Sequence, residues 1–356
     1  MILMPPMPAY SPVTAPDDDL FIAVAHASSP GISLYRWTGS AFGAKIGNTV
    51  ELDTSISGIA ISPNHKCLAV ALASSPYVRV YSVSRTGFGP PYSSPATLPG
   101  GWCRNVVFSP DGAYIAVAQF DSPYVSCWNW STTTGFGVKL TDPATTPTGI
   151  GFGVSFNANS QYLAVAHASS PAISVYPVST TAIGTKVSNP ASLPGGDGTC
   201  VCFADISPSS PGIVVGSTAS PYIHSYPWNG TAFGTKHGDP SPLPASQPNS
   251  IQISTESGAS ICGYALNASP YYEKRTWQQS DGMSGAGPHG AAATLPTGAG
   301  NGFYMCRTPY FAFGVAHNTS PYVSVYDSSA PPVKYSNPST LPAGNGKSLV
   351  IFQIGS

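Results

Sequence analysis

The chain has 356 residues, of which only 8% are charged, and its formal net charge is −1. This composition provides no basic surface to hold phosphate groups, so it disfavours nucleic-acid binding. Glycine and proline contribute 37 residues each, beside 19 tyrosines and 14 phenylalanines, which favours many short strands joined by tight turns. No uninterrupted apolar run approaches the roughly 18 residues of a membrane span.

The first segment, residues 1–19, reads MILMPPMPAYSPVTAPDDD. It is too rich in proline for a central strand, and it lacks the basic start and long apolar run of a signal peptide. The chain is therefore expected to fold in a reducing cytoplasm. Two interpretations of the segment are open. It is either a loose tail or an arm that docks on a neighbouring subunit through Met4, Pro5, Pro6, Met7 and Tyr10.

From residue 20 onward the sequence repeats. A Ser-Pro dipeptide recurs seven times at intervals of 46 to 51 residues. Each copy follows a short apolar segment, such as FIAVAH at 21–26, and precedes an alternating one, such as ISLYRW at 32–37. Alternation with β-branched and aromatic residues is typical of a strand with one packed face. The prolines of the seven copies are Pro30, Pro76, Pro123, Pro171, Pro221, Pro270 and Pro321.

Two more segments complete each repeat. A turn leads to a third strand, such as GFGVK at 135–139, and a proline-rich connection leads to a fourth, such as CRNVVF at 103–108. Four strands in about 48 residues indicate a propeller blade. The chain ends with KSLVIFQI at 347–354, which has the character of the innermost strand. We therefore predict an all-β, seven-bladed β-propeller over 20–356, with four antiparallel strands per blade. Pairing of the C-terminal strand with the N-terminal blade would close the ring.

The octapeptide AVAHASSP occurs twice, at 23–30 and 164–171, and combines histidine with serine. Its histidine position holds His26, His167 and His317 in three repeats but leucine in two others, Leu72 and Leu266. A metal site needs three or four ligands around one ion, and a nucleophilic serine needs a base and an oxyanion hole. The sequence instead predicts packed, hydrogen-bonded histidines at strand ends and Ser-Pro turns. We expect no cofactor and no metal.

Two sets of residues are candidates for contacts with a ligand or partner. Tyrosines follow five of the Ser-Pro pairs and would ring one face, where they either stack on sugars or contact a protein, or simply pack against the adjacent loop. They are Tyr77, Tyr124, Tyr222, Tyr271 and Tyr322. The sixth repeat departs from the pattern with a run of charges and a glycine-rich loop, which is either a contact surface or a tolerated variation. Its candidates are Glu273, Lys274, Arg275, Trp277, Met283 and His289.

Catalytic carboxylates are scarce, because only 15 Asp and Glu residues are present and three of them lie in the tail. Glycosidases require a pair of carboxylates flanking the scissile bond. Arg104 and Arg307 fall in or near the strands closest to the central channel and could line it. No set of residues here indicates a reaction.

The repeats VAHASSPxISVYP, FGTKxSNPASLPGG and VVFSPDGAYIAVAQ resemble those of WD-repeat-like propeller proteins of tailed bacteriophages. The resemblance covers about residues 20–354 and provides no catalytic residue to transfer. It implies a virion location, with partners among capsid or tail proteins.

The expected function is that of a non-enzymatic virion structural protein, displayed on the tail, fibre or capsid, that mediates protein–protein contacts. One alternative is a propeller that binds a host-surface receptor or carbohydrate during adsorption. A second is a glycan hydrolase.

Overall fold

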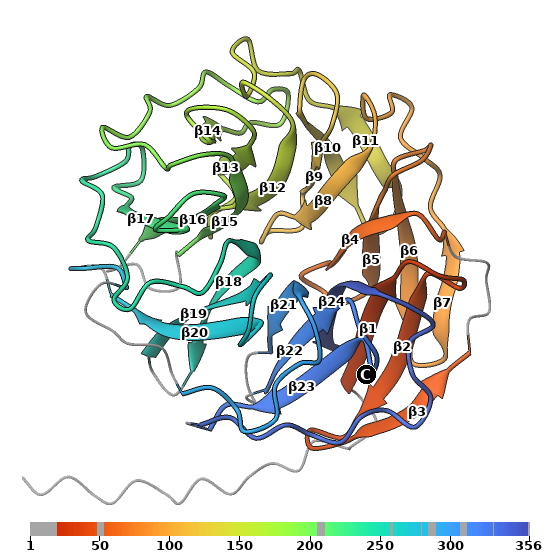
Figure 1. Ribbon diagram of the computed structural model, residues 1–356. Coiled ribbons are helices and arrows are strands. Elements are labelled where there is room, and N and C mark those ends of the chain that lie inside the picture. Colours follow the sequence, from red (N-terminus) through yellow and green to blue (C-terminus); the bar gives the residue numbers. More distant parts are fainter. Residues whose placement is uncertain are drawn as a thin grey trace, which may run out of the picture.

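The computed structural model describes residues 20–354 apart from 48–52, 205–210, 257–258, 279, 284–289, 307–311 and 330. The predicted docking arm, with Met4, Pro5, Pro6, Met7 and Tyr10, and the loop residue His289 lie outside these residues. The described chain forms seven antiparallel sheets of three or four strands, which Figure 1 shows around a common centre. This arrangement is consistent with a seven-bladed propeller, and we number the sheets as blades one to seven.

Three blades have four strands. Blade one consists of β24 (Gly346–Gln353), β1 (Leu20–His26), β2 (Ile32–Trp37) and β3 (Phe42–Ile46). Blade two consists of β4 (Ile56–Ile61), β5 (Cys67–Leu72), β6 (Val78–Ser84) and β7 (Gly87–Pro91). Blade three consists of β8 (Cys103–Phe108), β9 (Tyr114–Gln119), β10 (Val125–Ser131) and β11 (Gly135–Lys139).

The other four blades have three strands. Blade four consists of β12 (Gly151–Phe156), β13 (Tyr162–His167) and β14 (Ile173–Pro177). Blade five consists of β15 (Gly198–Phe203), β16 (Gly212–Ser217) and β17 (Ile223–Pro227). Blade six consists of β18 (Pro248–Glu256), β19 (Ala259–Leu266) and β20 (Tyr272–Trp277). Blade seven consists of β21 (Gly300–Met305), β22 (Ala312–His317) and β23 (Val323–Asp327).

Within the described residues, the prediction of four strands in every blade is therefore wrong for blades four to seven. Their outer segment is reduced to an isolated bridge, such as Val178 with Ile183. In blades four and five the reason is a proline at the end of the third strand. Pro177 accepts a hydrogen bond from the Gly184 N–H on the outer side, but it has no N–H to donate in return. Pro227 occupies the same position in blade five, with Gly234 as its donor.

The C-terminal strand pairs with the first strand, as predicted. In blade one, β24 lies antiparallel to β1, and Ile351 is paired with Ile22; Figure 1 shows these two strands side by side. No strand pairs with a strand of another sheet in the described part of the chain, so the circle is not a hydrogen-bonded barrel. It arises because each innermost strand packs against the next, and β21 packs against β24.

Apolar side chains fill the spaces between neighbouring blades. One cluster, for example, joins Val80 of blade two to Val106 and Val117 of blade three. The turns between the second and third strands add close backbone contacts, because the first residue of the next innermost strand lies against them. A Cβ atom on Gly151 would be 2.3 Å from the Tyr124 carbonyl oxygen, and one on Gly346 would be 2.3 Å from that of Tyr322. Glycine at these positions lets adjacent blades approach.

The histidines are packed strand-end residues, as predicted. His26 is buried, and its Nε2 atom lies 2.9 Å from the Ser33 hydroxyl oxygen on the adjacent strand. The same pair recurs in blade four between His167 and Ser174, and in blade seven between His317 and Ser324. Blade five exchanges the two positions, with Ser217 opposite His224 at 3.0 Å.

These buried histidines predict acid sensitivity. Burial lowers the pKa of His26, His224 and His317 to about 4, from an ordinary value of 6.5. Between those values the unfolded chain binds protons that the folded chain does not, so the free energy of unfolding should fall as the pH is lowered from 6.5 to 4. The shift corresponds to roughly 3 kcal/mol for each histidine. Thermal unfolding across this range measures the effect.

The matched variant for this experiment is His26→Leu, since Leu72 occupies the same position in blade two. It should lose some stability at neutral pH, because Ser33 loses its partner, and should show a shallower decline between pH 6.5 and 4. An unchanged slope would show that His26 does not contribute to the acid sensitivity.

Candidate functional site

A β-bulge occurs at the same position in the innermost strand of every blade. The pairing of this strand with the next shifts register at one point, between Cys103 and Asn105 in blade three for example. Bulges insert an extra residue, re-aim its side chain, and are frequent beside active sites. We call the inserted residues the mouth ring. In the order of blades one to seven, they are Lys347, Ser57, Arg104, Phe152, Thr199, Asn249 and Asn301.

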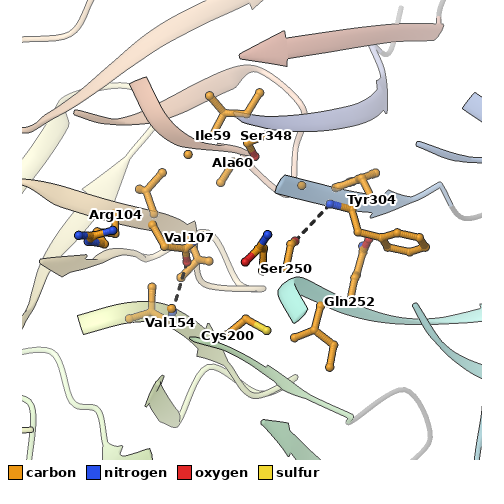
Figure 2. Close-up of a pocket in the computed structure, with 18 of the residues that line it drawn as sticks. Ile59, Ala60, Arg104, Val107, Val154, Cys200, Ser250, Gln252, Tyr304 and Ser348 are labelled. Atoms are coloured by element: carbon orange, nitrogen blue, oxygen red, sulfur yellow. Dashed lines mark hydrogen bonds between the residues drawn. The ribbon is translucent and has the colours of Figure 1, made fainter. Parts of the chain in front are cut away.

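All seven residues of the mouth ring line one cavity of about 620 Å³. The cavity lies at one end of the channel, on the side of the turns between the second and third strands, since Ala27 and Ala73 of those turns also line it. A second cavity of about 340 Å³ continues along the channel between the seven innermost strands. Figure 2 shows Arg104, Cys200, Ser250 and Gln252, from three different strands, around this space.

The mouth ring has an uneven chemistry. Its two cations, Lys347 and Arg104, belong to blades one and three, and Ser57 lies between them in blade two. Thr199, Asn249 and Asn301 provide hydroxyl and amide groups in blades five to seven. No Asp, Glu or His is among the described residues that line the mouth cavity. The mouth therefore suits a ligand with negative charge at one end and polar groups at the other.

Arg104 is held between two aromatic rings. Its guanidinium carbon lies 4.0 Å from the centroid of Trp102 and 5.0 Å from that of Phe152. Trp102 is itself fixed, because its Nε1–H donates to the Ser57 hydroxyl at 2.7 Å and its ring stacks on Phe120. Such stacking orients a cation. Arg104 is thus a pre-positioned positive charge.

Arg104 is also desolvated. Burial lowers the pKa of its guanidinium, although an arginine stays charged at any physiological pH. Its Nε atom is buried without a hydrogen-bond partner. An unsatisfied buried donor on a cation costs free energy. The terminal N–H groups of the guanidinium remain to bind an oxyanion in the cavity, which Arg104 lines.

The channel below the mouth is mainly structural. Its polar side chains bond to the backbone of the next blade, as Asn105 Oδ1 accepts from the Val154 N–H and Ser250 Oγ from the Phe303 N–H; both bonds are drawn in Figure 2. Burial raises the pKa of the Cys200 thiol to about 12. This channel-lining cysteine is therefore protonated and cannot act as a nucleophile.

Among the described residues, no group of three or more His, Cys, Asp or Glu side chains could hold a metal ion. No helix in that part of the chain is long and apolar enough to cross a membrane.

The five candidate tyrosines are half-buried turn residues and do not line the mouth cavity. Each has a positive φ of 67° to 69° and donates its backbone N–H to the residue three positions earlier, as Tyr124 does to Asp121. The ring of Tyr77 packs against the apolar cluster between blades two and three. The equivalent turns of four other blades hold Tyr124, Tyr222, Tyr271 and Tyr322.

The described candidates for a contact surface in blade six are internal rather than exposed. Glu273, Lys274, Arg275, Trp277 and Met283 are all buried, with exposed fractions of 8% or less. Glu273 Oε2 accepts from Arg275 at 2.8 Å and from the Tyr264 hydroxyl at 2.7 Å.

The repeat explains why these charges are internal. Arg275 takes the position of Tyr35 in blade one and Tyr226 in blade five, whose hydroxyls donate to the carbonyls of Thr340 and Ser192 in the incoming connection. Arg275 donates in the same way to the Pro242 carbonyl, at 2.8 Å. The charged run thus fills a structural position of the repeat.

Of the sequence candidates that the structure describes, only Arg104 lines the mouth cavity, while Arg307 lies outside the described residues. The other residues of the mouth ring carried no sequence motif. Their shared signal is positional, since each follows the first residue of an innermost strand.

Comparison with known proteins reveals the fold but no sequence family. No protein-family model and no curated protein matches the chain. Solved structures do match. A protein from Bacteroides uniformis assigned as a 6-phosphogluconolactonase shares 13% identity with a TM-score of 0.69, over 94% of this chain and 100% of that one. The periplasmic gluconolactonase of Pseudomonas aeruginosa shares 14% identity with a TM-score of 0.70, over the same shares. A Bacteroides fragilis protein, also assigned as a 6-phosphogluconolactonase, shares 9% sequence identity with a TM-score of 0.68, over 94% of this chain and 98% of that one.

These comparisons correct the functional prediction. The expectation of a non-enzymatic phage virion protein is contradicted, because the structural neighbours are named as lactonases. Nothing in the comparisons indicates a phage origin or a WD-repeat identity, and the chain is similar instead to propellers of the 6-phosphogluconolactonase type. The expected virion partners and location are not tested by these findings and stay predictions.

Proposed function

We propose that this chain is a lactone hydrolase whose active site is the cavity at the channel mouth. The observation that carries the proposal is Arg104, a partly buried cation that stacks on Trp102 and Phe152 and lines the mouth cavity. The names of the structural neighbours support the choice of a lactone as substrate.

In the proposed reaction, the oxygen of a water molecule attacks the lactone carbonyl carbon, and the carbonyl electron pair moves to its oxygen. The resulting oxyanion lies against the Arg104 guanidinium. Collapse of this intermediate breaks the ring C–O bond, the ring oxygen takes up a proton as a hydroxyl, and the acid releases a proton to solvent. Donors fixed in a water-poor site before the reaction stabilise such an oxyanion strongly.

In this proposal, the residues of the mouth ring act by binding the substrate and by supplying positive charge. Because no carboxylate or imidazole is among the described residues lining the mouth, activation of the carbonyl replaces a protein general base, and water itself is the nucleophile. Lys347 provides a second cation on the same side for an anionic substituent such as a phosphate or carboxylate.

The direct test follows acid release by the purified full-length protein with gluconolactone and with 6-phosphogluconolactone. We expect a saturable rate above the spontaneous hydrolysis of each compound. Hydrolysis no faster than in buffer alone, for both substrates, would overturn the proposal.

A further inference from the structure

Three consecutive residues of the mouth ring hold the next blade by a repeated hydrogen bond. Thr199 Oγ1–H donates to the Pro248 carbonyl at 2.6 Å, Asn249 Nδ2–H to that of Gly300 at 2.8 Å, and Asn301 Nδ2–H to that of Gly346 at 2.8 Å. Each acceptor is the first residue of the next innermost strand. The orientation of both amides is thereby fixed, since only the amide nitrogen can donate to a carbonyl.

The hydrogen-bond inventory of Asn249 leaves one atom for a ligand. A side-chain amide has two N–H donors and one carbonyl acceptor. Its two donors are engaged by the Gly300 carbonyl and by Asn267 Oδ1, the latter at 2.6 Å. Because both N–H groups are engaged by these two acceptors, the atom of Asn249 that remains to bind a ligand in the mouth cavity is Oδ1, an acceptor. Asn301, in the next blade, donates one N–H to the Gly346 carbonyl, and its second N–H can still donate to a ligand.

The two sides of the mouth therefore bind different chemical groups of a ligand. Arg104 and Lys347 can only donate, and they attract oxyanions. Asn249 presents its carbonyl oxygen, which needs a donor such as a hydroxyl. A ligand that satisfies both sides carries a carbonyl or anionic oxygen at one end and hydroxyl groups at the other.

We infer that Asn249 is a specificity-determining residue that selects polyhydroxylated lactones by accepting a hydrogen bond from one of their hydroxyls. This inference rests on the proposed function, which concerns the lactone carbonyl, and adds the recognition of the rest of the substrate. A site built to bond a hydroxyl discriminates against an analogue that lacks it, because its own polar groups are then left unpaired.

The test compares gluconolactone with valerolactone, a lactone of the same ring size without hydroxyls, in the full-length protein. The wild type should prefer gluconolactone. Asn249→Leu should lower kcat/KM for gluconolactone about tenfold, the worth of one such hydrogen bond, and change kcat/KM for valerolactone less than about twofold. Melting temperatures confirm that the variant is folded.

Ser250→Ala is the matched control. It removes another bond from blade six to blade seven, the one that Ser250 Oγ accepts from the Phe303 N–H, at a residue that does not line the mouth cavity, so any effect of weakened blade contacts should lower the rates for both lactones by the same factor. If Asn249→Leu also lowers both equally, Asn249 is structural and the inference is wrong. A wild type that hydrolyses both lactones without preference overturns the inference but not the proposed function. A wild type that hydrolyses neither overturns the proposed function itself.

Discussion

Replacing Arg104 with methionine should lower kcat for lactone hydrolysis by roughly 100- to 1000-fold, the usual cost of removing one donor to a developing oxyanion. Methionine preserves much of the apolar stem that packs between Trp102 and Phe152, but it has no charge and no N–H. Because the guanidinium is proposed to act mainly in the transition state, KM should change much less than kcat. Steady-state kinetics with gluconolactone measure both.

Two further variants define what this result means. Arg104→Lys keeps the charge but loses the planar group that stacks on both rings, so it should recover only part of the rate. Arg85→Met removes an exposed arginine that lines neither the mouth nor the channel and should retain wild-type kinetics. An Arg104→Met protein that is folded and as active as the wild type would exclude oxyanion stabilisation by this residue.

Deleting residues 347–356 should abolish cooperative folding. The deletion removes most of β24, whose Leu349, Val350, Ile351 and Phe352 are each 1–2% exposed and belong to two apolar clusters on either side of blade one. Each such side chain contributes roughly 1.5–3 kcal/mol on burial, so their combined loss is comparable to the whole stability of a typical domain, about 5–15 kcal/mol. It also leaves β1 without its inner partner.

The control deletes ten residues at the other end, residues 1–10, which leaves every described contact in place. Thermal unfolding followed by circular dichroism should show a cooperative transition for this chain and none, or one at a much lower temperature, for the C-terminal deletion. A C-terminal deletion that keeps the wild-type melting temperature would show that pairing of β24 with β1 does not hold blade one together.

Much of the fold could be predicted because the same pattern of an apolar segment, a Ser-Pro turn and an alternating segment occurs seven times. The apolar segments before each Ser-Pro became the buried second strands, and the histidines within them pair with serines, as at His26 and Ser33. The outer strands were less predictable. Their loss in blades four and five depends on Pro177 and Pro227. Both prolines are visible in the sequence, but the missing N–H prevents outer pairing only because that side of the residue faces outward in the folded blade.

The charged run of blade six shows why local composition misled the site prediction. Three charged residues in a row usually indicate a solvated surface. Aligned with the repeat, however, Arg275 stands where Tyr35 and Tyr226 stand, and it makes the same bond to an incoming connection. The position in the fold, rather than the residue type, determines that this arginine is buried.

The sequence by itself determined the strand order, the seven repeats and the pairing of the last strand with the first, because period, alternation and turn residues are local properties. Only the tertiary structure decided which residues form the site. Lys347, Arg104, Asn249 and Asn301 are far apart in the chain and share no motif. They meet because a register shift in each sheet re-aims one side chain and because seven innermost strands surround one channel. Both conditions depend on pairing and packing between distant segments, which no local pattern records.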